Sequence, residues 1–197
     1  MAMNMLYDTE GNPRFTKSYL IPVGDLSLEA RVVMRQDSDN ILIQNALRLR
    51  VRDDPKDLIV RDILPNADLG LAASDDWLVP VAGVVGAESV YFSVALPNTV
   101  VHAYYGISVE TVPFTFSRIR LAQSATATNV KGVFQLEQLF SRLEPVGYFS
   151  QPVIFPNQQV IRVLLMARIA SLLNTQRVTL LGRAAEPIGD TISSPGL

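Results

Sequence analysis

The sequence predicts an all-β protein: an antiparallel β-sandwich, with the jelly roll as the favoured version and at most one or two short helices. Residues 89–96 and 160–169 place an apolar side chain at every second position, which is the period of a strand. Turn-forming Pro, Gly, Asn and Asp residues separate such stretches at short, irregular intervals, giving about eight to ten strands. No repeat of about 20 to 50 residues is visible, so a solenoid or propeller is not expected.

The chain has the size of one ordinary domain, with 197 residues. We expect an N-terminal arm at residues 1–17, a single β-sandwich domain at residues 18–186 and a C-terminal tail at residues 187–197. The arm is compatible with a frayed terminus and with an ordered segment that grips a neighbour. Its sequence lacks the basic start and apolar core of a signal peptide, so an intracellular product is expected.

Composition favours a subunit that is buried among neighbours. Hydrophobic residues make up 48% of the chain and charged residues only 18%. The net charge of -2 excludes a general polyanion binder, so nucleic acid could bind only through a local arginine patch. Only three of the 17 basic residues are lysine, and arginine is enriched at protein interfaces, although GC-rich genomes favour it too. No apolar run reaches the length of about 18 residues that a membrane span needs.

The first half of the chain contains one regular alternation of apolar and basic residues. Residues 18–23 fit a short strand, and residues 26–34 fit either a helix or a strand. Residues 46–52 then alternate Leu, Leu and Val with three arginines, which predicts a strand carrying the basic comb Arg48, Arg50 and Arg52. The comb could bind phosphates or an acidic partner, or it could be a solvated face paired with acids on a return strand at residues 58–64.

The single tryptophan follows two acids in a loop-like segment. A tryptophan beside carboxylates can stack on a sugar ring while the acids accept hydrogen bonds from its hydroxyls, so Asp75, Asp76 and Trp77 are the candidate glycan contact. A tryptophan in the core or in an interface is the simpler alternative.

The middle of the chain predicts a hairpin and a strand that changes direction. Residues 89–96 and 100–105 form the expected hairpin. In residues 107–121 the alternation changes phase, which requires a bend or bulge near Pro113 and another near Ser117, or two strands. Residues 131–143 fit a short helix or a strand.

Residues 158–183 hold the longest dense apolar run and four arginines. We expect a closing hairpin here, with a turn at residues 171–176. Only one parity of pairing puts Ile169 opposite Val178 and Ala167 opposite Leu180 on a shared core face.

The opposite face of this predicted hairpin mixes aliphatic side chains with arginines. That mixture is typical of a contact surface between proteins. The candidate assembly interface therefore consists of Arg162, Leu164, Met166, Arg168, Arg177, Leu181 and Arg183.

The sequence shows no motif for catalysis, a metal or a cofactor. His102 is the only histidine and cysteine is absent, so neither a zinc site nor thiol chemistry is expected. No nucleophile elbow accompanies His102, which we interpret as structural. Residues 37–42 begin like a calcium loop but place Ile and Leu where an oxygen ligand and a glycine belong. Phosphate-binding glycine motifs are also absent, so we expect no enzyme and no cofactor.

The segment GYFSQPVIFPNQQVIRVLLMAR, followed by RVTLLGRAAEP, resembles in style the single jelly-roll capsid and decoration proteins of viruses. The resemblance covers about the last third of the chain and contains no signature motif. It implies a strand, a Pro/Asn turn and a closing hairpin. We therefore expect a structural virion or shell protein, made in the host cytoplasm, whose partners are itself and other shell proteins. The alternative is a carbohydrate- or receptor-binding β-sandwich.

Overall fold

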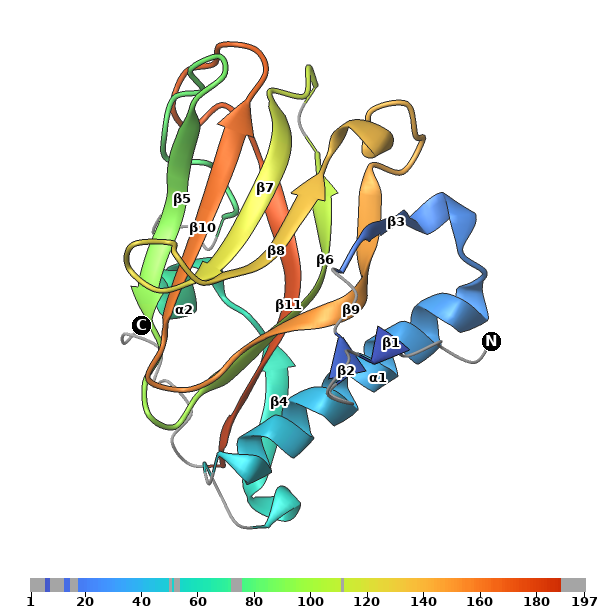
Figure 1. The fold of residues 1–197 in the computed structure, drawn as a ribbon, viewed down its shortest axis with the longest axis vertical. Helices are drawn as coiled ribbons and strands as arrows, with labels where there is room; N and C mark the ends of the chain where they lie inside the picture. The colour runs from blue at the N-terminus through green and yellow to red at the C-terminus, as the bar shows by residue number, and fades with distance from the viewer. Residues whose placement is uncertain are drawn as a thin grey trace.

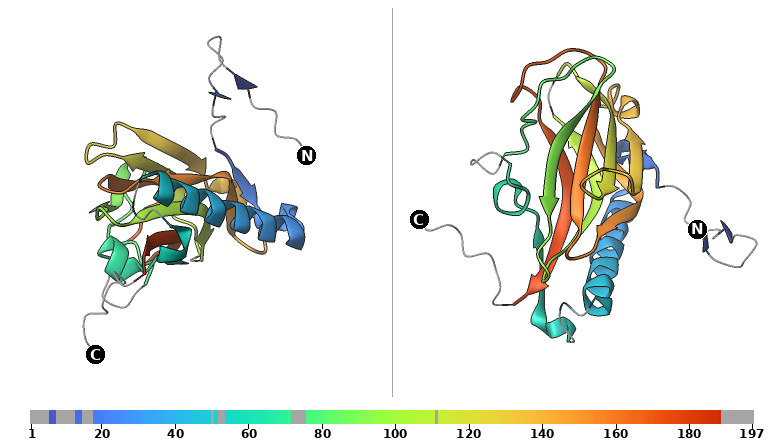
Figure 2. Two further views of the ribbon diagram at one scale, coloured as in Figure 1. Left: turned by 90° about the horizontal axis from the view of Figure 1, so that it is seen from below. Right: turned by 60° about the vertical axis from the view of Figure 1, so that its left-hand side comes forward.

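The computed structural model describes residues 6–7, 13–14, 18–49, 51, 54–71, 76–110 and 112–188. These residues form two facing β-sheets, with one long helix lying against the outer side of one sheet (Figures 1 and 2). Every strand pair is antiparallel. The predicted all-β antiparallel sandwich is confirmed.

One sheet has four strands and the other has five. The four-stranded sheet has the order β5 (Glu88–Ala95), β10 (Val160–Ala167), β7 (Phe116–Gln123) and β8 (Val130–Gln135). The five-stranded sheet has the order β3 (Leu20–Pro22), β9 (Val146–Phe155), β6 (Val101–Val109), β11 (Val178–Pro187) and β4 (Leu58–Asp62). A separate ladder in the predicted arm pairs β1 (Leu6–Tyr7) with β2 (Pro13–Arg14).

From β4 to β11 the chain changes sheet at every step except between β7 and β8, which form a hairpin. As a result β4, β11, β6 and β9 lie side by side in one sheet and face β5, β10, β7 and β8 in the other. This order fits the two Greek keys of a jelly roll. The jelly roll stays a prediction, now with the strand order in its favour.

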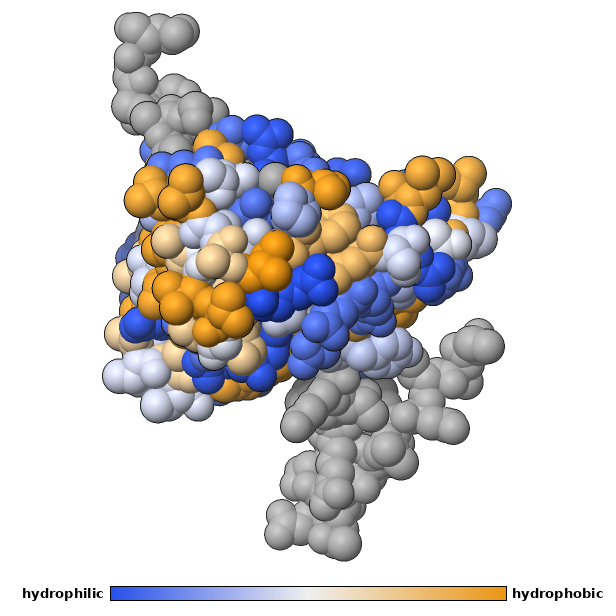
Figure 3. All heavy atoms as spheres, turned by 90° about the horizontal axis from the view of Figure 1, so that it is seen from above, coloured by the Kyte–Doolittle hydropathy of each residue, from blue (hydrophilic) through white to orange (hydrophobic). Residues whose placement is uncertain are grey.

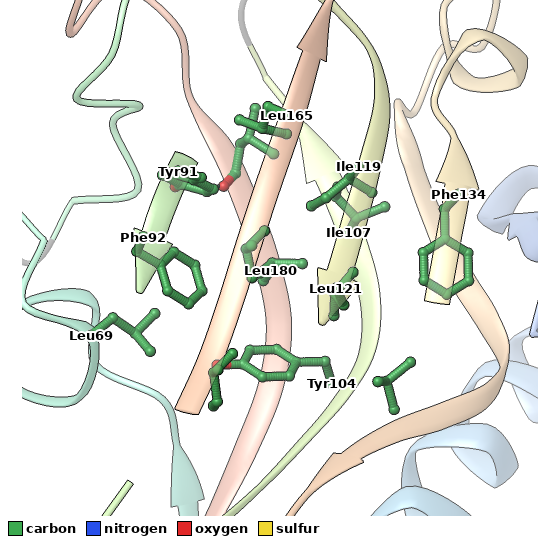
Figure 4. Close-up of a cluster of buried hydrophobic side chains, with 14 of the residues drawn as sticks. Leu69, Tyr91, Phe92, Tyr104, Ile107, Ile119, Leu121, Phe134, Leu165 and Leu180 are labelled. Atoms are coloured by element: carbon green, nitrogen blue, oxygen red, sulfur yellow. The ribbon is translucent and has the colours of Figure 1, made fainter. Parts of the chain in front are cut away.

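The main hydrophobic core fills the space between the two sheets (Figure 4). Phe134 of β8 and Phe149 of β9 stack across it with ring centroids 3.9 Å apart. Tyr91 lies at a bulge in β5, and its hydroxyl donates to the carbonyl oxygens of Trp77 and Val178, both at 2.8 Å. Burying this hydroxyl is tolerated because it finds acceptors.

The predicted core faces of the last two strands are confirmed. The inward side chains are no more than 2% exposed; in β10 they are Ile161, Val163, Leu165 and Ala167, and in β11 Val178 and Leu180. The predicted hairpin between these strands is wrong, because β10 pairs with β5 and β7 while β11 pairs with β6 and β4. Periodicity shows which face of a strand is buried, but not which strand lies beside it.

The predicted hairpin of residues 89–96 and 100–105 is wrong for the same reason. Its strands became β5 and β6, which lie in different sheets. Prediction and structure agree on the phase change in residues 107–121, which form two strands, with β6 ending at Val109 and β7 starting at Phe116. Residues 131–143 contain all of β8 except Val130, and a short 3-10 helix, η3 (Glu137–Leu139).

The helix α1 (Leu28–Arg48) is longer than predicted. Its N-cap is Ser27, whose side chain accepts a hydrogen bond from the Ala30 N–H at 3.2 Å and so caps the first turn. Leu42 and Ala46 pack on the outer face of the five-stranded sheet in a second hydrophobic cluster. The other helical segments are short: η1 (Val23–Asp25), η2 (Pro55–Asp57) and α2 (Pro65–Leu69).

The predicted strand at residues 46–52 is wrong, because residues 46–48 continue α1. Arg48 is exposed on the helix, while Arg50 and Arg52 lie outside the described residues. The three buried positions of α1 are Ser38, Leu42 and Ala46. Only Leu42 is a large apolar residue, so the helical period is weak in the sequence.

We predict that Leu42→Ala lowers the free energy of unfolding by about 2 to 5 kcal/mol, because Leu42 is fully buried between α1 and the sheet. Leu28→Ala in the same helix is the matched control, since Leu28 is 72% exposed and should change stability by less than about 0.5 kcal/mol. Urea unfolding measures both. Equal effects of the two substitutions would show that α1 is not anchored through Leu42.

Candidate assembly surfaces

The structure divides the predicted assembly interface between the two sheets. Arg162, Leu164 and Met166 point outward from β10, on the outer face of the four-stranded sheet. Arg168 follows directly after β10. The remaining predicted residues, Arg177, Leu181 and Arg183, belong to β11 or its entry and lie with the five-stranded sheet.

The outer face of the four-stranded sheet is largely occupied by contacts within the chain. Glu88 of β5 accepts hydrogen bonds from Arg118, at 2.7 Å, and from Arg120. Leu164 is only 7% exposed, because it packs with Val90 and with the loop that follows β7. This face therefore offers less apolar surface to a partner than the alternation in β10 suggested.

Arg168 has an aromatic partner within the chain. Its guanidinium carbon lies 4.6 Å from the centroid of the Phe140 ring, and Phe140 stacks on Phe114 at 4.8 Å. The Arg168 Nε–H donates to the Phe114 carbonyl at 3.2 Å. These contacts fix the side chain at the end of β10.

The two described residues of the predicted glycan contact, Asp76 and Trp77, make contacts within the chain. Asp76 accepts a hydrogen bond from Arg177 at 2.8 Å, and this bond raises the pKa of Arg177 above its usual value. Trp77 is partly buried against the main core, and its carbonyl accepts from Tyr91. Asp75 lies outside the described residues.

Arg183 links the five-stranded sheet to α1. Its guanidinium lies 3.0 Å from Asp62 of β4 and 3.5 Å from Asp39 of α1. Leu181, two residues before it on the same strand, is half-buried. These two residues of the predicted interface thus lie on the sheet face that carries the helix.

A buried polar cluster, which the sequence did not reveal, lies near the far end of β11. Arg61 of β4 donates to both oxygens of Glu186 at 2.8 and 2.9 Å and to both oxygens of Asp68 at 2.7 and 2.8 Å. Burial alone would raise the pKa of Asp68, but hydrogen bonds from Arg61 and from the Leu64 N–H outweigh it and hold the pKa below its usual value. The cluster ties β4, β11 and α2 together.

His102 adjoins this cluster from β6. It faces inward with Tyr104, whose hydroxyl lies 3.3 Å from the His102 Nδ1. Burial is the main reason that the pKa of His102 falls to about 4; nearby Asp68 opposes the fall. A cavity of about 320 Å³ lies beside His102, Asp68 and Glu186. His102 is therefore neutral at pH 7, as a structural histidine would be.

Four exposed aliphatic side chains lie in two loops at one end of the sandwich. Val84, Val85, Leu172 and Leu173, called here the loop-end patch, are between 58% and 76% exposed. Figure 3 views this end from above and shows hydrophobic residues gathered on its left. In the sequence this patch corresponds to two pairs of adjacent aliphatic residues in loops, VV before Gly86 and LL before Asn174. A search for strand periodicity does not detect such pairs.

Backbone hydrogen bonds hold these two loops together. Gly83 and Ser171 exchange N–H···O bonds of 3.1 Å in both directions, and the Gly86 N–H donates to Ala167 at 2.9 Å. Gly83 allows the close approach, because a Cβ there would come within 2.8 Å of the Ser171 Oγ. Gly86 adopts a φ of 75°, in the left-handed region that glycine tolerates. The patch is thus presented on a fixed backbone.

Comparison with known proteins found no matching family model, no matching curated protein and no matching solved structure. Within the described part of the chain, no helix combines the length and apolar character needed to cross a membrane. The same residues contain no group of three or more His, Cys, Asp or Glu side chains placed to hold a metal ion.

We predict that acid destabilises the protein through His102. Its pKa is about 4 in the fold and about 6.5 in an unfolded chain, so the unfolded state binds more protons between these values. Stability should fall by up to about 3 kcal/mol as the pH drops from 6.5 to 4.

His102→Asn provides the comparison, because it keeps a polar side chain but removes the titration. The variant should lose distinctly less stability than the wild type over this pH range in thermal or urea unfolding. Identical pH dependence of the two proteins would contradict the assignment.

Proposed function

We propose that this chain is a structural subunit of a protein shell, of the capsid or capsid-decoration type, located in a virion. The observation that carries the proposal is the loop-end patch. Its four aliphatic side chains are exposed together, whereas monomeric proteins usually expose such residues singly. A contiguous exposed apolar patch marks a contact surface.

Copies of the same chain are the partners we propose for this patch. Most soluble oligomers are homo-oligomers with closed symmetry, in which neighbouring copies use the same surface around a common axis. A patch at the end of a sandwich can meet its equivalents around such an axis. The hydrogen bonds between Gly83 and Ser171 reduce the conformational entropy that the loops lose on association.

Two further observations agree with the proposal. Hydrophobic residues make up 48% of a chain with a near-neutral net charge of -2, as expected for a subunit surrounded by others. The sequence of residues 147–168 and 177–187 resembles in style that of jelly-roll shell proteins, and the strand order fits a jelly roll. Other shell proteins are the additional partners that this function would require.

We predict that the double variant Leu172→Asp, Leu173→Asp prevents self-association. Each buried aliphatic side chain contributes about 1.5 to 3 kcal/mol, so losing two should weaken association at least about a hundred-fold. Light scattering over a wide concentration range measures the mass. The wild type should form multimers, and the variant should stay monomeric.

The matched control is Ile188→Asp, since Ile188 is 61% exposed but lies at the opposite end of β11. It should assemble like the wild type. A wild-type chain that is monomeric at every concentration and binds no shell partner would contradict the proposed function.

A further inference from the structure

The cavity beside the buried polar cluster has the composition of a small-molecule site. It has a volume of about 320 Å³ and lies where α2, β5, β6 and β11 meet. Part of its wall is apolar and includes Val94 and Leu96. Three polar side chains that are at most 9% exposed also line it: Asp68, His102 and Glu186. Sites for small ligands combine an apolar lining with a few such polar groups, in volumes from about 300 Å³ upward.

One polar atom of this wall has no partner. The His102 Nε2 is buried and has no hydrogen-bond partner among the described residues. The other ring nitrogen, Nδ1, lies 3.3 Å from the hydroxyl of Tyr104, which is not part of the cavity wall. Because the two nitrogens point away from each other, Nε2 is the one directed at the cavity. A buried polar atom is unfavourable unless it is paired, so this atom calls for a bound group.

The Tyr104 hydroxyl determines where His102 carries its proton. Tyr104 lies fully buried in the core (Figure 4), and burial raises its pKa, so the phenol keeps its proton. The His102 Nδ1 is the acceptor within reach of this O–H. A neutral imidazole that accepts at Nδ1 carries its own proton on Nε2. The cavity therefore contains an unpaired N–H donor.

The charges around the cavity restrict what could bind there. Arg61 contributes one positive charge, and Asp68 and Glu186 contribute one negative charge each, so the cluster has a net charge of -1. This charge repels an anion. A cation would be attracted, but it offers no acceptor to the His102 N–H.

A neutral hydroxyl group satisfies both sides of the cavity. Its oxygen can accept from the His102 Nε2–H while its O–H donates to a carboxylate. Glu186 accepts two hydrogen bonds from Arg61, and a carboxylate has about four acceptor positions, so it can accept another.

We propose that this cavity binds a small neutral molecule that carries a hydroxyl group on an apolar body. The ligand oxygen accepts from the His102 Nε2–H, its O–H donates to Glu186, and the apolar body packs on Val94 and Leu96. A water molecule occupies about 30 Å³ in the liquid, so the cavity admits on the order of ten non-hydrogen atoms. The site does not depend on the proposed shell function.

Titration with cyclohexanol, followed by NMR at pH 7, tests the site. His102 is the only histidine, so the ring nitrogens of the isotope-labelled protein give unambiguous signals. The free protein should show the proton on Nε2. Cyclohexanol should shift this signal to saturation at millimolar concentration, as expected for so small a ligand. Cyclohexylammonium and cyclohexanecarboxylate should bind more than about ten-fold more weakly, because the cavity must bury their charge.

Ala67→Phe tests the location. Ala67 is exposed at the rim of the cavity on α2, so a phenyl ring there can occupy the cavity while His102 keeps its contact with Tyr104. The shift caused by cyclohexanol should be lost. Ala125→Phe, at an exposed position in the loop after β7, is the matched control and should respond like the wild type. Nuclear Overhauser contacts from cyclohexanol to the methyl groups of Val94 locate the ligand independently.

Any of four results would overturn the proposal. A His102 signal that none of the three probes shifts would show that the cavity holds only water. Tighter binding of either charged probe would contradict the ligand class. A proton on Nδ1 would remove the donor on which the site depends. An unchanged response in Ala67→Phe, without contacts from cyclohexanol to Val94, would place the ligand elsewhere.

Discussion

The hydrophobic interface between the two sheets is the interaction on which the rest of the structure depends. Inward residues of β10 and β11 are almost completely buried there, although these strands lie in opposite sheets. The segment between them must therefore cross the end of the sandwich instead of making a tight turn at a sheet edge. That crossing places Leu172 and Leu173 at the surface, next to Val84 and Val85. The candidate assembly surface is a consequence of the strand order.

The distribution of charge explains why the loop end, rather than a sheet face, is the better candidate for assembly. On the outer face of the four-stranded sheet, Glu88 engages Arg118 and Arg120, and Leu164 is covered by the chain itself. On the five-stranded sheet, α1 covers part of the outer face, and Arg183 is held by Asp39 and Asp62. The loop-end patch has no such covering among the described residues.

Strand positions and buried faces could be read from the sequence because alternation reports burial directly, as in Ile161, Val163 and Leu165. The pairing partner of each strand could not be read from the sequence. The same apolar alternation is compatible with a next strand that lies beside it in the same sheet and with one that lies across the core in the other sheet. The sequence left residues 26–34 open between helix and strand and missed the full length of α1, because Leu42 is its only large buried residue. The cluster of Arg61, Asp68 and Glu186 unites three elements that are distant in sequence, and no local pattern marks it.

The most direct test of the central claim compares amide hydrogen exchange in the assembled protein with exchange in the diluted protein. If copies meet through the loop-end patch, assembly should protect residues 80–86 and 168–177 and leave the outer faces of both sheets unchanged. Protection confined to β5, β10, β7 and β8, or no protection at either loop, would contradict the account.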